Sequence, residues 1–436
     1  LLRREVSGKG WALRAIFEIA RRLGADVAVL EADLHPAVGG LVEEGLSPAW
    51  IRLLLEPLGI SGEKCVDFVL ASFERHWLET LASDHFLRPL LLALFGVEIR
   101  DPLSGVFAVS NELLERFLER KDAWVRDVCR YGVDVWLLLQ AISANTRIGE
   151  VHLGVKKHHS SPLKPSFVLR EQAKVLFEHV CEALNSRQQS LGVKETRGVE
   201  VAGRAAGGKG SVVGTCEKAC GESICCIRTP VRLGCIPRGL VSGRCICRTP
   251  PKGTDAILHA YLTKFKQGFN KFHTLYREIL SESAFSSLKS IVETLTTKEH
   301  RSIYWHTKKE SQKQRGMQIE FSAKLWSEIV YDFILAFCER RFARGDILNA
   351  FIPLFLCRVA SFCFGLKNLE TLLSGVEDAE LRGRILCDEA CRRLEEEEEA
   401  FLMAKSQFIA EFKKRSAAEK KGEGVPKLHP PVLPPK

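Results

Sequence analysis

Residues 7–33 read SGKG-WALRAIFEIARRL-GA-DVAVLEAD, from Ser7 to Asp33. Apolar residues at helical spacing over 11–23 predict a helix that ends at Gly24. The run 26–33 is apolar without alternation and ends in two carboxylates, which is typical of a buried parallel strand. A helix followed by such a strand predicts an α/β layer, in which ligands bind beyond the carboxyl ends of the strands. Glu31 and Asp33 are therefore candidate binding residues.

The α/β pattern continues to about residue 190. Apolar periodicity predicts helices over 48–58, 77–95, 111–120 and 166–187. The stretch 132–142 fits either a helix or a strand, and we favour a helix. Residues 147–159 predict a strand that ends in a basic, His-containing tip. We therefore expect one α/β domain over 1–190.

The composition changes at about residue 191. From 191 to 253 Gly, Cys and Arg dominate and apolar periodicity is lost, so we expect an insert or linker without regular structure. Helical periodicity returns over 254–416, which predicts an all-helical domain. The Lys- and Pro-rich end, 417–436, is expected to be disordered.

The overall composition is that of a globular protein. The chain has 436 residues, of which 46% are hydrophobic and 27% charged, enough for two or three domains with sizeable cores. The most apolar run, 347–366, contains Pro353 and Arg358, so we expect a buried helix and no membrane span. The net charge of +9 is spread along the chain. No groove lined by Arg and aromatic residues stands out, and no nucleic-acid partner is expected.

The fifteen cysteines fall into two groups. Seven lie between 216 and 247, and their spacings do not form the paired knuckles of a zinc module, although zinc stays an open alternative. The other eight are scattered among helical patterns, as expected of buried, reduced thiols in a cytoplasmic protein. The first residue is Leu1 and no signal-peptide pattern follows it, so we expect an N-terminally truncated chain.

Four short segments place charge or free backbone groups beside predicted element ends. Gly8-Lys9-Gly10 offers flexible backbone and a cation at a helix N-terminus, without the spacing of a P-loop. The run 156–159 contains groups that can bind a metal or a phosphate. The turn 101–105 has backbone N–H groups suited to a small acid, and Asp134 interrupts an apolar stretch. Each segment also has a plainer explanation, as a basic turn, a surface loop, a solvated turn or a helix N-cap.

The order of these segments resembles one group of sugar-nucleotide-dependent glycosyltransferases. These are the retaining GT-A enzymes that make glucosylglycerate, glucosyl-3-phosphoglycerate and mannosylglycerate. The resemblance covers 7–187 and resumes in 261–280 and 325–362, which look like the group's C-terminal helical domain. It implies a Rossmann-like nucleotide-sugar domain, here without its first strand and nucleotide loop, followed by an all-α domain.

On the donor side, the resemblance implies roles for four residues. Lys9 matches the lysine that contacts the nucleotide-sugar, and Glu31 stands where the D-x-D motif has its first Asp. Asp33 matches the last Asp of that motif and would bind Mg²⁺ or Mn²⁺. His158, in the sequence Gly-x-Lys-x-His, matches the second protein ligand of that metal.

On the acceptor side, Ser104 and Gly105 match the acceptor-binding loop, and Asp134 matches an acidic residue beside the sugar and acceptor, which we take as the catalytic candidate. The resemblance implies a hexosyltransferase that moves glucose or mannose from a UDP- or GDP-sugar to D-glycerate or 3-phosphoglycerate. The alternative is an inactive scaffold or interaction protein that has lost its donor site. The sequence leaves a homo-oligomer open.

Overall fold

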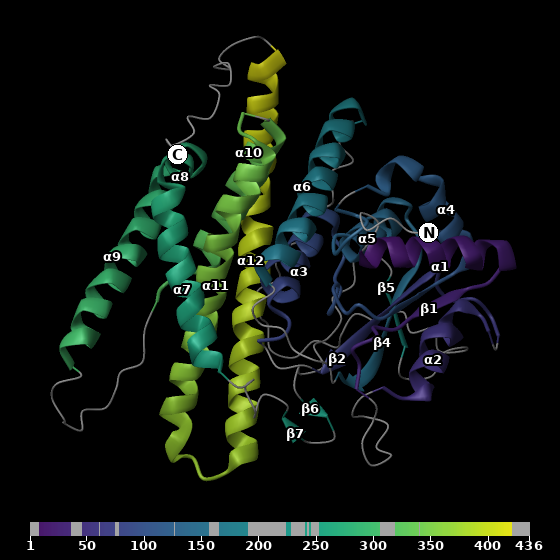
Figure 1. The fold of residues 1–436 in the computed structure, drawn as a ribbon, viewed down its shortest axis with the longest axis horizontal. Coiled ribbons are helices and arrows are strands. Elements are labelled where there is room, and N and C mark those ends of the chain that lie inside the picture. The colour runs from purple at the N-terminus through teal and green to yellow at the C-terminus, as the bar shows by residue number, and fades with distance from the viewer. Residues whose placement is uncertain are drawn as a thin grey trace, which may run out of the picture.

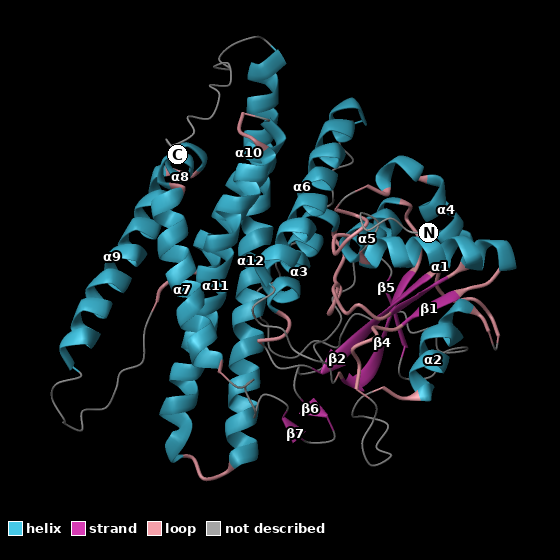
Figure 2. Cartoon of the chain, in the orientation of Figure 1, coloured by secondary structure: helices cyan, strands magenta, loops and turns pink. Residues whose placement is uncertain are grey.

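The computed structural model describes residues 8–35, 46–60, 62–74, 78–125, 127–156, 165–190, 224–227, 240–241, 244–245, 253–305, 319–339 and 341–420. It has two parts. The N-terminal half is a twisted sheet with helices on both faces, and the C-terminal half consists of long helices (Figure 1). The five strands of this sheet gather in one part, whereas the C-terminal half from α7 onward is helical in the residues described (Figure 2).

The sheet has the strand order β1-β3-β2-β4-β5. β3 is antiparallel to both β1 and β2, β2 is parallel to β4, and β4 is antiparallel to β5. β1, β2 and β4 therefore point the same way, and their carboxyl ends meet at one edge of the sheet. The strands span Val27–Val29 (β1), Phe68–Glu74 (β2), Phe107–Val109 (β3), Ile148–Val155 (β4) and Ile224–Ile227 (β5).

The structure corrects three expectations about strands. β1 is not an inner parallel strand, because the one described strand that pairs with it, β3, is antiparallel. The strands β2 and β3 had no counterpart in the sequence analysis. Within 191–253, expected to lack regular structure, the run ICCI forms β5 on the edge of β4, and β6 (Leu240–Val241) pairs with β7 (Arg244–Cys245). The rest of 191–253 lies outside the described residues.

Helices cover both faces of the sheet. Alternate strand residues point to opposite faces: Phe68 and Leu70 join the large core under α1, α4 and α5, whereas Val69 and Ala71 pack with Trp50 of α2. The helices of this half are α1 (Lys9–Leu23), α2 (Pro48–Leu55), η2 (Glu56–Leu58), η3 (Ser83–Leu87), α3 (Arg88–Leu90), η4 (Leu91–Phe95), α4 (Asn111–Glu119), η5 (Lys121–Ala123), α5 (Val133–Ser143) and α6 (Pro165–Ser190).

The helical half is built around α11. The helices are α7 (Thr254–Lys271), α8 (His273–Ile279), α9 (Glu282–Trp305), α10 (Ala323–Glu339), α11 (Arg344–Leu372), η7 (Leu373–Gly375) and α12 (Ala379–Lys420). The helical segment Arg344–Gly375 is long and apolar enough to cross a membrane, but 89% of its most apolar window is buried within the protein. We therefore interpret α11 as a core helix, as the sequence analysis expected for 347–366.

A buried polar cluster joins the two halves. Glu397 of α12 is fully buried, and its Oε2 accepts hydrogen bonds from His85 Nδ1 at 2.8 Å and Arg358 Nη2 at 2.6 Å. The indole N–H of Trp326 donates to the carbonyl of His85 at 2.6 Å. Burial by itself raises the pKa of Glu397, but Arg358 and His85 outweigh it and hold that pKa below its ordinary value. A charge on α12 is thus tied to η3 of the first half.

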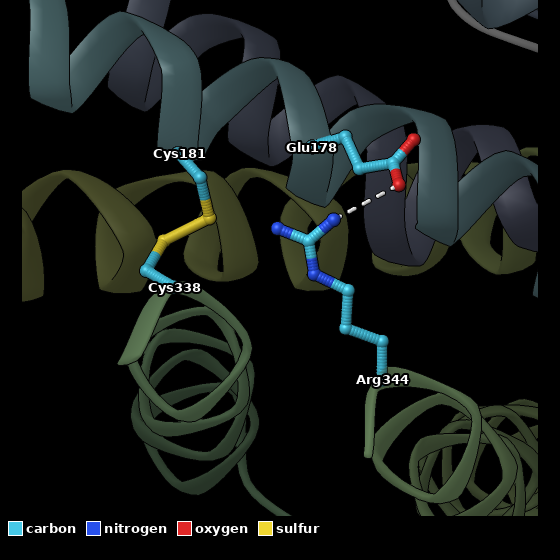
Figure 3. Close-up of a disulfide and its surroundings, with 4 residues drawn as sticks. All are labelled: Glu178, Cys181, Cys338 and Arg344. Carbon is cyan, nitrogen blue, oxygen red and sulfur yellow. Dashed lines mark hydrogen bonds and ion pairs between the residues drawn. A yellow bond between two sulfur atoms is a disulfide. The ribbon is translucent and has the colours of Figure 1, made fainter. Parts of the chain in front are cut away.

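A disulfide is the second connection between the two halves. Cys181 of α6 is bonded to Cys338 of α10, beside the ion pair in which Arg344 Nη1 donates to Glu178 Oε1 at 3.2 Å (Figure 3). This corrects the expectation that all eight scattered cysteines are reduced thiols. The structure has the other six as free thiols, namely Cys65, Cys129, Cys357, Cys363, Cys387 and Cys391.

We predict that reduction destabilises the protein. The disulfide closes a loop across a sequence separation of 157 residues, and a native disulfide typically contributes about 2–4 kcal/mol. Dithiothreitol should lower the midpoint of thermal unfolding of the wild type and leave the Cys181→Ser/Cys338→Ser variant unchanged. If dithiothreitol leaves the unfolding midpoint of the wild type unchanged, the Cys181–Cys338 disulfide is contradicted.

Candidate functional site

The N-terminus of α1 packs closely against the backbone of residues 128–130. A Cβ atom at Gly10 would overlap the carbonyl oxygen of Val128, and one at Gly8 would overlap that of Cys129. The Trp11 N–H donates to the Cys129 carbonyl at 3.2 Å. The sequence analysis expected these glycines to let backbone approach a ligand. Instead, they let α1 approach the segment that leads into α5.

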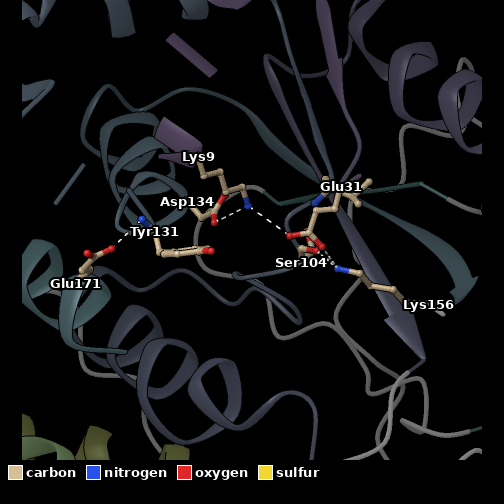
Figure 4. Close-up of polar contacts among 8 residues, drawn as sticks. Lys9, Glu31, Ser104, Tyr131, Asp134, Lys156 and Glu171 are labelled. Carbon is tan, nitrogen blue, oxygen red and sulfur yellow. Dashed lines mark hydrogen bonds and ion pairs between the residues drawn. The ribbon is translucent and has the colours of Figure 1, made fainter. Parts of the chain in front are cut away.

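This contact brings Lys9 to two carboxylates. Lys9 Nζ lies 2.8 Å from Asp134 Oδ2 and 3.4 Å from Glu31 Oε1 (Figure 4). Burial opposes the charge of Lys9, but Asp134 and Glu31 together outweigh it and raise the pKa of this ammonium above its ordinary value. Lys9 is therefore a cation at neutral pH. An ammonium group has three N–H donors, and Lys9 uses two of them for Asp134 and Glu31. The third N–H has no described acceptor and could bind a ligand.

A second lysine approaches the same carboxylate from the other side. Lys156 directly follows β4 and is only 6% exposed. Its Nζ donates to Glu31 Oε2 and, at 2.7 Å, to the carbonyl of Ser104, and it lies 5.5 Å from the ring centroid of Phe73. Glu31 thus lies between two lysines and bridges them.

The loop 101–105 closes around Glu31. Gly105 has a φ of +71°, and a Cβ atom there would overlap the Glu31 carboxylate, so both backbone conformation and space require glycine. The Ser104 N–H donates to the Asp101 carbonyl at 3.1 Å. Among the described residues, the N–H groups of Leu103 and Gly105 have no acceptor.

The segment before Asp134 is held by α6. Glu171, 2% exposed, accepts the Tyr131 N–H at 2.9 Å, and Lys174 pairs with Asp127 (Figure 4 shows the first contact). Burial raises the pKa of the Glu171 carboxyl, and the Tyr131 N–H partly offsets that rise. Asp134 then stands in the first turn of α5, so the helix N-terminus stabilises its negative charge.

A buried carboxyl on β4 lies behind the loop. Glu150 is 4% exposed, and its Oε1 accepts the N–H of Arg100 at 2.8 Å and that of Asp101 at 3.4 Å. Burial raises the pKa of Glu150 to about 7, although the two backbone donors work against that rise.

The structure brings five of the predicted site residues to one place, whereas Asp33 does not contact them. Asp33 is exposed in the turn after β1, without a hydrogen bond or ion pair to a described residue, and His158 lies outside the described residues. The residues that do converge at this edge of the sheet are Lys9, Glu31, Ser104, Gly105 and Asp134.

Three supporting residues were missed. Lys156 was seen only as part of a basic tip, and its position directly after a strand was the signal that could have singled it out. Glu150 lies in a strand among apolar residues, where a carboxylate needs a partner. Glu171 lies in a helix with many charges, and nothing in its spacing marks it as buried.

The described residues offer little to a metal ion by themselves. They contain no group of three or more His, Cys, Asp or Glu side chains placed to bind one. Both oxygens of Glu31 face lysines, which leaves Asp33 as the exposed oxygen donor after β1. A single carboxylate fits Mg²⁺ or Mn²⁺ held mainly by phosphate oxygens and water, and does not fit a site closed by protein ligands.

Comparisons with known proteins found a partial likeness to solved structures. No protein-family model and no curated protein matches the chain. Glucosyl-3-phosphoglycerate synthase from Mycobacterium tuberculosis, in complex with phosphoglyceric acid, is 26% identical with a TM-score of 0.31 over 41% of this chain and 56% of that one. The same enzyme with Mn²⁺, UDP-glucose and phosphoglyceric acid is 26% identical with a TM-score of 0.27, over 40% and 55%. The chain thus spans little more than half the length of these proteins.

The raised pKa of Glu150 predicts a pH-dependent stability. Between its ordinary value of 4.5 and about 7, the folded protein holds a proton on Glu150 that the unfolded chain releases. This contribution is complete below pH 4.5 and is lost as pH rises to 7, a change on the order of 3 kcal/mol. Chemical unfolding at pH 5 and 7.5 should show a smaller loss of stability in Glu150→Gln than in the wild type. Equal losses would contradict the burial of an ionisable group here.

Proposed function

We propose that the chain is a glycosyltransferase of the GT-A type, which uses a nucleotide-sugar as donor. The observation that carries the proposal is the convergence of Lys9 and Lys156 on Glu31 at the carboxyl edge of the sheet. In open α/β sheets this edge is where ligands bind. The sequence resemblance supports the same reading, since its donor-side residues Lys9 and Glu31 are in direct contact.

The two lysines suit the diphosphate of the donor. Lys9 provides a point charge with an N–H donor, the form in which lysine commonly binds phosphate, whereas Lys156 is buried, donates to Glu31 and the Ser104 carbonyl, and would act through its charge. Lys9 has one donor left for a phosphate oxygen while Asp134 and Glu31 hold it in place. Because both lysines are largely shielded from water, their charges act on the leaving diphosphate with little solvent screening.

A divalent cation, Mg²⁺ or Mn²⁺, forms the second part of the proposal. Asp33 would hold it, with His158 as the second ligand that the sequence resemblance implies. When bound, such a cation neutralises charge that develops on the diphosphate as the glycosidic bond breaks.

The acceptor would lie between the loop 101–105 and Asp134. The N–H groups of Leu103 and Gly105 suit the carboxylate of D-glycerate or 3-phosphoglycerate. We propose transfer of glucose or mannose with retention: the acceptor hydroxyl attacks the anomeric carbon on the face that the diphosphate leaves. The C–O bond to the diphosphate breaks, and a diphosphate oxygen takes the hydroxyl proton. Asp134 then orients the sugar or acceptor and keeps Lys9 in place.

One observation favours a second candidate, a non-catalytic scaffold. Lys9 and Lys156 already have carboxylate partners within the protein, so the cluster balances its own charge without a ligand. In that case the cluster only joins α1, β1 and β4. Domain limits of 1–190 and 254–416, with an insert or linker over 191–253, remain part of the proposal, as do a cytoplasmic location, the lack of a nucleic-acid partner and an open oligomeric state.

The first test is a donor and acceptor screen. UDP- and GDP-linked glucose and mannose, each with D-glycerate or 3-phosphoglycerate, should give a glycosylated product by mass spectrometry in one combination. Lys9→Met should lower kcat/KM about 10²–10³-fold, the usual loss on removing one preorganised charge. Lys64→Met is the matched control, since Lys64 pairs with Asp67 and Glu112 away from this cluster. Absence of product in every combination would favour the scaffold.

The metal assignment has its own test. Asp33→Ala and His158→Ala should each abolish transfer that depends on added Mg²⁺ or Mn²⁺, because each removes a ligand of the cation. Activity is measured against metal concentration after chelation. If both variants keep wild-type activity at every concentration, the metal assignment is wrong.

A further inference from the structure

One buried carboxyl beside the site has no part in the proposed reaction. Glu150 accepts two backbone N–H groups through one oxygen, while its other oxygen has no hydrogen-bond partner among the described residues. Burial of a carboxyl without full hydrogen bonding is costly. An apolar side chain would be less costly to bury at this position in β4. Packing alone therefore does not explain why a glutamate lies there.

The two N–H groups belong to the entrance of the loop 101–105. Asp101 in turn accepts the Ser104 N–H through its carbonyl at 3.1 Å and the Ser83 hydroxyl through Oδ1 at 3.3 Å. A displacement of the backbone at Arg100 and Asp101 would therefore move Ser104. Glu150 acts on the loop from its first residue.

The same strand also holds the far end of the loop. Lys156, directly after β4, donates to the Ser104 carbonyl at 2.7 Å and to Glu31. The carboxyl group of Glu150 on β4 thus accepts N–H groups at the start of the loop. The ammonium group of Lys156, just beyond β4, donates to a carbonyl near the end of the loop. Between these two anchors lie the N–H groups of Leu103 and Gly105, which have no described acceptor.

We propose that Glu150 is a positioning residue that fixes the loop 101–105 so that its open N–H groups face an acidic acceptor. The identity of that acceptor rests on the proposed function, whereas the fixing of the loop does not. Glu150 touches no reacting atom in this account. It acts through the backbone of Arg100 and Asp101.

The experiment compares Glu150→Ala, which removes the acceptor oxygen, with Glu150→Gln, which keeps one. Asp67→Asn is the matched control, because Asp67 also accepts a backbone N–H, that of Arg147 at 3.3 Å, at the opposite end of β4. The first readout is amide hydrogen exchange of peptides that cover 97–107. The second is the KM for glycerate and 3-phosphoglycerate, together with the Kd for the nucleotide diphosphate alone.

We expect exchange at 100–105 to be at least tenfold faster in Glu150→Ala, with Glu150→Gln and Asp67→Asn close to the wild type. The acceptor KM should rise about tenfold in Glu150→Ala with the nucleotide Kd unchanged, and Gln should restore it. If Glu150→Ala does not fold, Glu150→Asp replaces it, because its side chain is one methylene shorter and its carboxyl lies farther from the loop. Its exchange at 100–105 and its acceptor KM should then rise less than in Glu150→Ala, but in the same direction.

Unchanged exchange in the Ala or Asp variant would overturn the inference. So would faster exchange in an active enzyme whose acceptor KM does not change. If the wild type transfers no sugar, the proposed function fails, but the exchange measurement still decides whether Glu150 holds the loop.

Discussion

Glu31 is the residue on which the site depends, because its carboxylate joins three separate segments of the chain. One oxygen faces Lys9 at the start of α1, the other faces Lys156 after β4, and the carboxylate fills the space that Gly105 leaves open. Without Glu31, Lys156 would lose a carboxylate partner, and Lys9 would keep only Asp134 among the described residues, although both ammonium groups are largely buried. The position of Glu31, two residues beyond the end of β1, therefore sets the position of the lysines on either side.

The helical half supports this arrangement from a distance. The α6 helix holds the 127–131 segment through Glu171 and Lys174, and the disulfide from Cys181 fastens the same helix to α10. The Glu397 cluster ties α12 to η3. A helix that carries the anchors of Asp134 is thus bonded to the bundle, which explains how the second half contributes to the site without supplying a described residue to it.

Patterns with strong periodicity were predictable. The helix at 11–23, the favoured helix at 132–142 and the strand within 147–159 are confirmed as α1, α5 and β4. The helical C-terminal half is also found. Short strands such as β3, with three residues, escaped because a period cannot be read over so few positions. The disulfide escaped because no local pattern marks two cysteines 157 residues apart as neighbours.

Charged residues were the hardest to place. Glu397 lies in the acidic run 395–399, yet it is fully buried, because Arg358 and His85 reach it from distant segments of the chain. Lys156 was seen as part of a surface tip and is buried for the same kind of reason. Among the predicted site residues, Lys9 contacts Glu31 and Asp134, whereas Asp33 is exposed to solvent.

We propose that the two lysines around Glu31 form a binding site for a nucleotide diphosphate. Titration calorimetry with UDP and with GDP tests it most directly, in the wild type and in Lys156→Met. We expect one bound nucleotide per chain in the wild type and at least tenfold weaker binding in the variant, with the far-ultraviolet circular dichroism unchanged. No binding of either nucleotide, or equal affinity in both proteins, would contradict it.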